Sequence, residues 1–447
     1  MSAEAFAERR FRIGLALLTL AGAVGRYAYL VISKVDQGRV LDQGDAFWYG
    51  STAWNLANGE VFRNYFSGGV TADHPPLTVL LLTPAAFFGE ENTWGQRLTM
   101  VVLGALVITV VGLAGRSLAG RRVGLAAAAV AMVMPALWIN DVLLMSETPA
   151  ALLIAAVIWT GIVLARAPSL RLAAGAGALC GLAALTRAEL GLLLPFMVWT
   201  TAVFARGVGW RPKLGLVLMS GAATAAVIAP WTLMNQSRFA EPVLISTNDG
   251  ITLAGANCDD AYFGERKGGW VINPCVIDAY ARLEAAKPPV PPGTPDACFD
   301  SLQAREPCLD ASEVSIEMRR EGLDYLRGHV ADVPGVIAAR NGRVWGLYRF
   351  DQSLDTGVDE GRPRLSTAVA FGFAWLMVPL GVGGLVLLRR RRESLIPFLA
   401  PLALVVLTTS AFTGLAPRYR LPWDVATCLL AGVALVHLMD RWAERRA

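Results

Sequence analysis

Charged residues are scarce in this chain. They make up 17% of its 447 residues, whereas an ordinary soluble domain carries about 25%. Hydrophobic residues account for 54%, and the mean hydropathy is +0.46. Apolar runs near 20 residues recur, the length that crosses a hydrocarbon core of roughly 30 Å. The composition excludes an ordinary soluble enzyme and predicts an all-α polytopic membrane protein, because a helix satisfies its own backbone hydrogen bonds in lipid.

Two sequence signals of other protein classes are also missing. The first apolar run, Ile13–Ile32, lacks an A-x-A-like cleavage site, so we expect it to remain as a span. No internal repeat is visible, which disfavours the inverted-repeat folds of secondary transporters. No nucleic acid is expected as a partner.

Arginine gathers in six clusters between the apolar runs, and the positive-inside rule assigns such clusters to the cytoplasm. This choice predicts about ten spans in the plasma membrane, with the C-terminal RWAERR in the cytoplasm. The clusters are Arg9, Arg10 and Arg12; Arg116, Arg121 and Arg122; Arg166 and Arg171; Arg206, Arg211 and Lys213; Arg389 to Arg392; and Arg441, Arg445 and Arg446. The predicted spans are 13–33, 96–115, 122–139, 148–165, 171–186, 188–205, 214–234, 365–388, 394–413 and 419–439.

The same topology places two long segments on the outer face. The first external loop covers about 34–95 and includes a short apolar run at 76–88, which we expect to be interfacial or re-entrant rather than spanning. The second segment, 236–363, is polar. We therefore divide the chain into an N-terminal transmembrane catalytic module (1–235), this external segment (236–363) and C-terminal transmembrane helices (364–447).

Four of the six cysteines lie in the external segment: Cys258, Cys275, Cys298 and Cys308. An even number in an exported segment predicts two disulfides, with three connectivities open, and four free thiols are the alternative. Cys180 and Cys428 lie in predicted spans and are interpreted as small core residues.

Acidic residues close to the predicted outer surface are the first candidates for chemistry. Asp45 precedes a stretch with helical spacing that ends at Asn58-Gly59. It can act as an N-cap, as a general base that deprotonates a nearby hydroxyl, or as both. Glu147 heads a span, where an acid also favours the positive end of the helix. Asn140 and Asp141 share its short loop, and together with Asp45 they could form an acidic cluster for an acceptor hydroxyl or a divalent cation. No cofactor or metal is assigned.

Basic residues on the outer side are few. Arg187 lies in a tight turn between two spans, and Arg418 and Arg420 open the last span. Arginine binds phosphate through paired, fixed donors, although snorkelling to ordinary headgroups is the alternative for each. His74 precedes a diproline that fixes the local backbone, and it could donate to a phosphate or bind a metal.

The order of these motifs resembles the GT-C membrane glycosyltransferases, in particular the bacterial branch of the protein O-mannosyltransferase and aminoarabinose transferase superfamily. The residues that carry the resemblance are GDAFWYGSTAWNLANG at 44–59, DHPPLTVLLLTPAAFFG at 73–89, the run at 115–153, GLAALTRAELGLLLP at 181–195 and RYRLP at 418–422. Each motif alone is weak, and the ordered set is more specific. The external segment matches only loosely.

The resemblance implies a fold and a reaction. Members pass a sugar from a polyprenyl-phosphate carrier to an acceptor outside the cytoplasm, by an inverting single displacement with one carboxylate base. By this resemblance Asp45 is the catalytic acid and Glu147 a second acid of the site. His74 stands where several relatives carry lysine before the diproline. Donor phosphate would be held by His74, Arg187, Arg418 and Arg420.

The expected function is therefore a polyprenyl-phosphate-sugar-dependent hexosyl- or pentosyltransferase. Its expected partners are that donor, membrane lipid, and a glycan, glycolipid or protein acceptor. A transporter or flippase of lipid-linked sugars, or an accessory subunit, remains the alternative. Charged residues at the outer ends of spans, rather than at the midplane, favour the transferase.

Overall fold

The computed structural model describes residues 2–33, 44–64, 69–89, 93–286, 310–412 and 417–446. Across these residues the protein is all-helical, and the one strand-like pairing is a β-bridge between Arg63 and Val70. The predicted helical class is confirmed. Cys298 and Cys308 lie outside the described residues, so the second predicted disulfide stays a prediction.

Six helices are long and apolar enough to span a membrane, and a bent pair makes a seventh candidate. The bend of 54° lies before Pro135, which cannot donate the backbone hydrogen bond that a continuous helix needs. The six are α1 (Ala3–Ile32), α4 (Thr93–Ala119), α7 (Glu147–Arg166), α10 (Trp210–Gln236), α17 (Arg364–Arg390) and α19 (Leu421–Glu444, with the turn η5, Pro417–Arg420, before it); the bent pair is α5 (Arg121–Val133) with α6 (Pro135–Trp138) and η1 (Asn140–Val142).

The other three predicted spans are shorter apolar helices. They are α8 (Leu170–Ala184), the run of η2 (Ala188–Leu192), η3 (Leu194–Trp199) and α9 (Thr200–Val203), and α18 (Ile396–Ala411). Since α8 has 15 residues, it is about 22 Å long, short of a full hydrocarbon core. All ten predicted segments are helical, but length and composition support six or seven spans, and the number ten stays a prediction.

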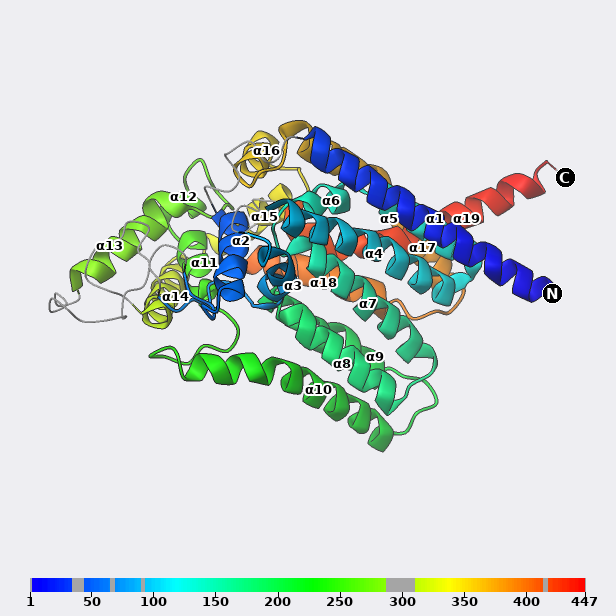
Figure 1. The fold of residues 1–447 in the computed structure, drawn as a ribbon, viewed down its shortest axis with the longest axis horizontal. Helices are drawn as coiled ribbons and strands as arrows, with labels where there is room; N and C mark the ends of the chain where they lie inside the picture. Colours follow the sequence, from blue (N-terminus) through cyan, green and yellow to red (C-terminus); the bar gives the residue numbers. More distant parts are fainter. Residues whose placement is uncertain are drawn as a thin grey trace.

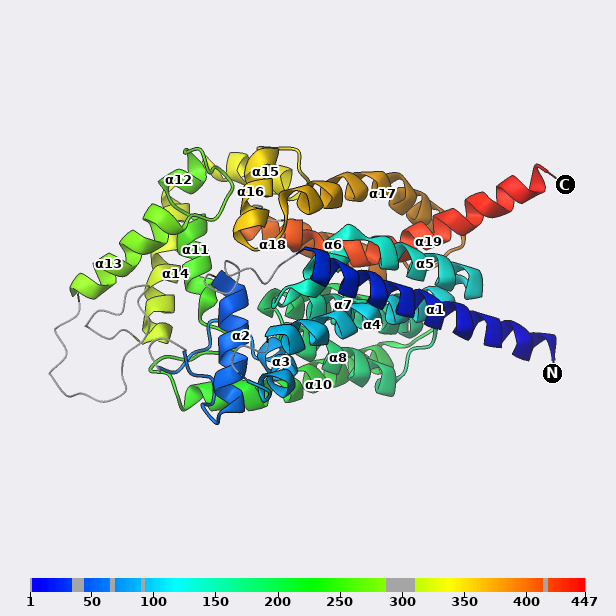
Figure 2. The ribbon, with the colours of Figure 1, turned by 45° about the horizontal axis from the view of Figure 1, so that its top comes forward.

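The long helices run side by side, with both chain termini at one end of the bundle (Figures 1 and 2). Ion pairs at this end involve arginines of two of the clusters. Glu8 binds Arg116 at 2.9 Å, and Arg166 binds Glu393 at 2.7 Å. Since α7 ends at Arg166 and begins at Glu147, about 30 Å of helix separates this basic end from the residues around Glu147.

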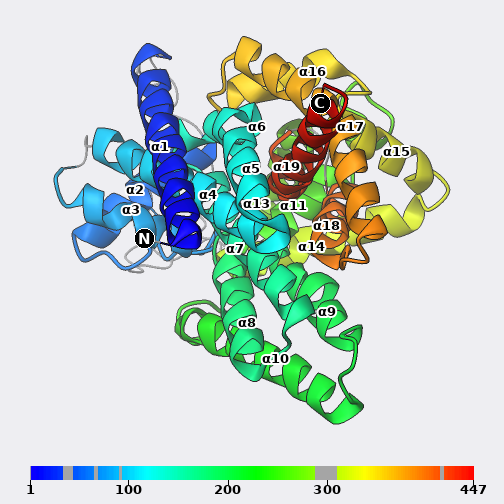
Figure 3. The same ribbon diagram turned by 90° about the vertical axis from the view of Figure 1, so that its right-hand side faces the viewer.

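Helix α19 forms the centre of the bundle. It packs against α4, α5, α7, α17 and α18, and it is the most buried of the candidate spans (Figure 3). Helix α1, by contrast, lies at the side of the bundle and leaves large apolar side chains exposed, among them Leu17, Leu20 and Ile32. Exposed apolar rows on a long helix are what contact with lipid tails requires.

The end of the bundle away from the termini carries the shorter helices (Figure 1). They are α2 (Gly44–Ala57), α3 (Leu77–Ala86), α11 (Asn248–Ala256), α12 (Asp259–Tyr262), η4 (Ile272–Val276), α13 (Ile277–Ala286), α14 (Ala311–Gly328), α15 (Val333–Val344) and α16 (Phe350–Asp359). Helix α3 has ten residues and packs against α2 and α4.

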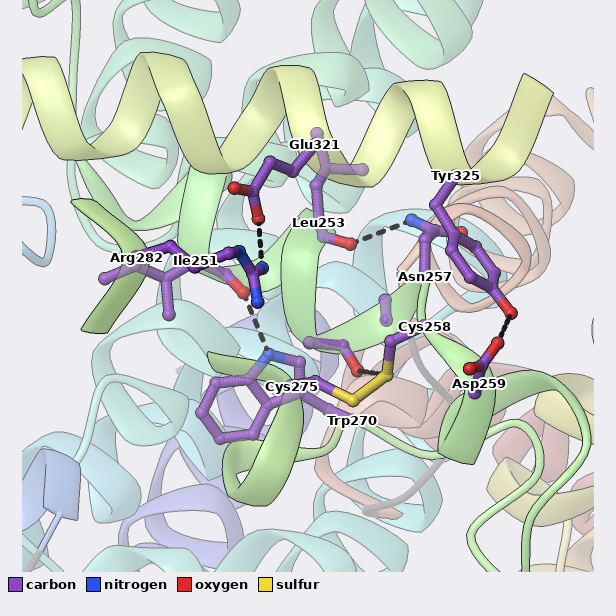
Figure 4. Close-up of a disulfide and its surroundings, with 12 residues drawn as sticks. Ile251, Leu253, Asn257, Cys258, Asp259, Trp270, Cys275, Arg282, Glu321 and Tyr325 are labelled. Atoms are coloured by element: carbon purple, nitrogen blue, oxygen red, sulfur yellow. Dashed lines mark hydrogen bonds and ion pairs between the residues drawn. A yellow bond between two sulfur atoms is a disulfide. The ribbon is translucent and has the colours of Figure 1, made fainter. Parts of the chain in front are cut away.

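A disulfide joins Cys258 to Cys275 in this region (Figure 4). Beside it, the Trp270 indole donates to the Ile251 carbonyl, and Arg282 on α13 pairs with Glu321 on α14 at 2.8 Å. One predicted disulfide is thereby present, and Cys180 and Cys428 are free and buried, as predicted. The three-part division of the chain stays a prediction.

Candidate active site

Asp45 lies in the first turn of α2. The helix begins at Gly44, so Asp45 does not take the N-cap position, which was one of the alternatives that the sequence left open. Its carboxylate accepts a hydrogen bond from Nη1 of Arg418 at 2.9 Å, and Nε2 of His74 lies 3.5 Å from its other oxygen. The side chain remains one-third exposed, so that a substrate can reach it.

Two neighbouring side chains decide the charge of Asp45. Burial acts to raise the pKa of this carboxyl, but its interactions with His74 and Arg418 outweigh burial and hold the pKa well below its usual value. Asp45 is therefore ionised at neutral pH, as a general base must be.

Glu147 is the first residue of α7 and is fully buried. Its oxygen Oε1 accepts from Nη1 of Arg187 at 3.0 Å and from Nη1 of Arg418 at 3.4 Å, and Nη2 of Arg362 is 3.9 Å away. Arg418 therefore joins Asp45 to Glu147 through a single nitrogen, although the two acids are more than 100 residues apart in the sequence.

Arg187 directly precedes η2, and its Nε donates to Glu189 at 2.7 Å. Burial acts to lower the pKa of this guanidinium, but Glu189 and Glu147 outweigh burial and raise it, so Arg187 stays charged. The ring of Tyr419 lies beneath both cations, at 5.4 Å from Arg187 and 5.5 Å from Arg418. Such cation–π contacts help to hold two like charges close together.

Aromatic rings fix the position of His74. Its imidazole stacks on Tyr49 with ring centres 5.0 Å apart and meets the edge of Trp48 at 4.9 Å. On its other side, Nδ1 is 3.4 Å from the side-chain nitrogen Nδ2 of Asn248 at the start of α11. The ring thus bridges α2 and α11 and directs one nitrogen at Asp45.

Two cavities meet at Asp45, Arg418 and Tyr419, which line both. The smaller has a volume of about 340 Å³, and its wall includes Tyr49, His74, Ser146, Arg187, Leu192 and Phe412. The larger has a volume of about 720 Å³, and its wall includes Asp260, Glu265, Trp270, Gln352, Asp359 and Glu360. Arg187 and His74 line the smaller cavity together with the acids Asp73, Glu189 and Asp249, and Arg418 reaches both cavities. The larger cavity is mainly acidic, with Arg266 as a further arginine in its wall.

One predicted site residue lies apart from this group. Arg420 is completely buried and donates to Asp424 at 2.9 Å and to the Val344 carbonyl at 3.1 Å. It lines neither cavity. The sequence could not separate it from Arg418, because both stand in the same short motif and a 3₁₀ turn directs them to different sides.

The expected acidic cluster is also divided. Asp141 pairs with the buried Arg26 of α1, accepts from Thr148 at 2.7 Å and lines neither of the cavities that Asp45 lines. Gly104 on α4 makes room for this carboxylate, since a Cβ there would lie 2.1 Å from Oδ2. Among the described residues, no group of three histidine, cysteine or acidic side chains is placed to hold a metal ion.

Two residues of the site were not recognised from the sequence. Glu360 binds Nη2 of Arg418 at 3.0 Å, and Arg362 forms an ion pair with Glu360 and donates to Asn140 at 2.9 Å. Both lie in the stretch that leads into α17. Arg187 was a candidate because it is an arginine at the outer end of a predicted span. Arg362 also stands at the outer end of a predicted span, so the same criterion could have identified it.

Residues 73–233 match the family described as dolichyl-phosphate-mannose-protein mannosyltransferase. The resemblance to this superfamily is confirmed. The matched region includes His74, Glu147 and Arg187 but ends before Arg418 and begins after Asp45. No curated protein matches the chain.

The fold is similar to that of the archaeal oligosaccharyltransferase AglB from Archaeoglobus fulgidus, solved with an inhibitory peptide and a dolichol-phosphate. The match has a TM-score of 0.56 at 13% identity and covers 99% of this chain and 52% of that one. The chain thus spans about half the length of this relative. A weaker likeness, with a TM-score of 0.42 at 15% identity, is to ArnT from Cupriavidus metallidurans bound to undecaprenyl phosphate, over 94% of this chain and 78% of that one. The first match supports a GT-C-like fold.

Proposed function

We propose that this protein is a glycosyltransferase that moves a sugar from a polyprenyl-phosphate-linked donor to an acceptor hydroxyl. The observation that carries the proposal is the position of Asp45, an ionised carboxylate between a smaller cavity that Arg187 and His74 line and a larger, mainly acidic one. The family name supports a lipid-phosphate sugar donor, and the AglB relative was solved with a dolichol-phosphate.

The smaller cavity would take the donor. Arg187, Arg418 and His74 supply donors for the phosphate, and Leu192 and Phe412 supply apolar surface for the start of the lipid. When the bond between the anomeric carbon and the phosphate oxygen breaks, the phosphate gains a negative charge. Two guanidinium groups already in place stabilise that charge without reorganisation.

The larger cavity would take the acceptor. Asp45 accepts the proton of the acceptor hydroxyl while the oxygen of that hydroxyl attacks the anomeric carbon from the side opposite the phosphate. A single displacement of this kind inverts the anomeric configuration. As the phosphate engages Arg418, that cation is shared with the new anion, and Asp45 becomes more basic than in the empty site.

The site would lie on the outer face of the plasma membrane. It is at the end of α7 opposite the arginine clusters, which the positive-inside rule assigns to the cytoplasm. The Cys258–Cys275 disulfide supports the same assignment, because disulfides persist in oxidising compartments. In this arrangement, residues 1–235 provide the base and most of the phosphate site, and the external segment 236–363 contributes most of the acceptor cavity.

Asp45→Asn tests the proposal, because it keeps the size of the side chain and removes its basicity. We expect inserted, folded protein whose sugar transfer in detergent is slower by roughly 10²–10⁴-fold. Asp351→Asn is the matched control: Asp351 also stands in the first turn of a helix, and it is exposed and outside both cavities. Transfer in detergent needs no second compartment, so a transporter would show none. Near-normal turnover of Asp45→Asn would remove Asp45 as the base.

A further inference from the structure

Glu147 is shielded from both cavities. The preceding residues Met145 and Ser146 line the larger and the smaller cavity, respectively. Among the described residues, Glu147 lines neither. The side chain is 0% exposed, and Arg187 and Arg418, which contact it, are themselves cavity-lining residues. A carboxylate behind two arginines cannot reach an acceptor hydroxyl, so its position is unsuited to proton transfer.

Three arginines from distant parts of the chain surround its oxygen Oε1. Arg187 comes from the turn after α8, Arg362 from the approach to α17, and Arg418 from η5, at 3.0, 3.9 and 3.4 Å. Guanidinium groups this close repel one another, and the repulsion is strong where water is largely absent. Glu147 is the anion that all three share.

Stability alone does not account for this carboxylate. Its second oxygen, Oε2, is buried and has no hydrogen-bond partner among the described residues. A buried charge that is only partly satisfied costs stability, and buried ion pairs are often no more stable than apolar side chains of the same size. The half-satisfied carboxylate therefore indicates a role in the site.

We propose that Glu147 is a positioning residue that holds Arg187 and Arg418 together as one clamp for the donor phosphate, and that it takes no part in the chemistry. The two arginines reach the smaller cavity from different turns, and Glu147 is the group that binds Nη1 of both. The ring of Tyr419 lies beneath both guanidinium groups and also lines this cavity. This inference rests on the proposed function and changes the role that the resemblance implied for Glu147.

The test compares carrier binding with turnover in the full-length protein. Binding of a short-chain polyprenyl phosphate is measured for wild type, Glu147→Gln and Glu147→Asp, alongside sugar transfer and thermal melting. We expect Glu147→Gln to weaken carrier binding at least tenfold. Glu147→Asp keeps the charge on a shorter side chain, so its carrier affinity should lie between those of Glu147→Gln and the wild type. Asp141→Asn is the matched control, because it removes another buried carboxylate from an arginine partner outside both cavities. It should lower the melting temperature and leave carrier affinity unchanged.

Each other outcome overturns the positioning role. Tighter binding by Glu147→Gln would show that the carboxylate merely neutralises the arginines, and unchanged binding with slow turnover would make it catalytic. If Glu147→Gln does not fold, wild-type carrier affinity in Glu147→Asp is the refuting result. Failure of the wild-type protein to bind any polyprenyl phosphate would instead refute the proposed function, so the two failures are distinguishable.

Discussion

Arg418 and Arg420 are two residues apart, and the structure predicts opposite consequences for their loss. Arg418 reaches both cavities and contacts Asp45, Glu147 and Glu360. Arg420 is enclosed with Asp424 on α19, beside the ring of Trp345. We therefore expect Arg418→Ala to weaken carrier binding and Arg420→Ala to lower stability.

The size of each effect follows from burial and charge. A charge-assisted hydrogen bond to phosphate contributes roughly 1.5–3 kcal/mol, so Arg418→Ala should raise the dissociation constant of a short-chain polyprenyl phosphate about ten- to a hundredfold. Lysine at this position should recover only part of the loss, because it cannot make paired contacts. Arg420→Ala leaves Asp424 buried without its cation, which costs about 3–5 kcal/mol of unfolding free energy.

The assay measures carrier affinity and thermal melting on the same detergent-purified samples. Arg187→Ala belongs with Arg418→Ala, because Arg187 also lines the smaller cavity. Two results would refute the reasoning: a loss of carrier affinity in Arg420→Ala equal to that in Arg418→Ala, or wild-type affinity in both Arg187→Ala and Arg418→Ala. The second result would mean that these arginines only bind ordinary lipid headgroups or contribute to packing.

Three further predictions concern the base, the topology and the disulfide. The pKa of Asp45 is held well below 3.8, so the stability that its ionised form contributes is present above pH 3.8 and is lost as the pH falls further. If Asp45 is the base, the decline of kcat/KM at acid pH should therefore lie below pH 3.8. A decline of kcat/KM centred near pH 6 would contradict this assignment. Single cysteines replacing Ser169 and Val330, both exposed, should label from opposite sides of the membrane, and an impermeant maleimide that reaches both in intact cells would overturn the topology. Peptide mapping without reductant should find Cys258 joined to Cys275, and replacing either by serine should destabilise the external segment.

Hydropathy, arginine distribution and local motifs were sufficient for the class of this protein. A low charge content and repeated apolar runs can satisfy the backbone in lipid only as helices, so the helical membrane fold followed from composition. Asp45 and Glu147 were recognisable because ionisable residues in or beside membrane spans are energetically costly and therefore indicate a functional role. The predicted spans 171–186 and 394–413 are longer than the helices found there, which have 15 and 16 residues, because hydropathy does not register where a helix ends.

The tertiary structure decided which of these residues meet. Asp45, Glu147, Arg187, Arg362 and Arg418 come from five separate stretches, and their ion pairs span up to 373 positions in the chain. Periodicity and motif spacing report only on neighbours within one helix or turn, so they could not show that Arg418 reaches Asp45 while Arg420 turns to Asp424. Nor could they show that Glu147 lies behind the arginines, because burial depends on how distant helices pack. The sequence alone therefore determined the helical membrane class and the candidate charges, and packing assigned each charge its partner.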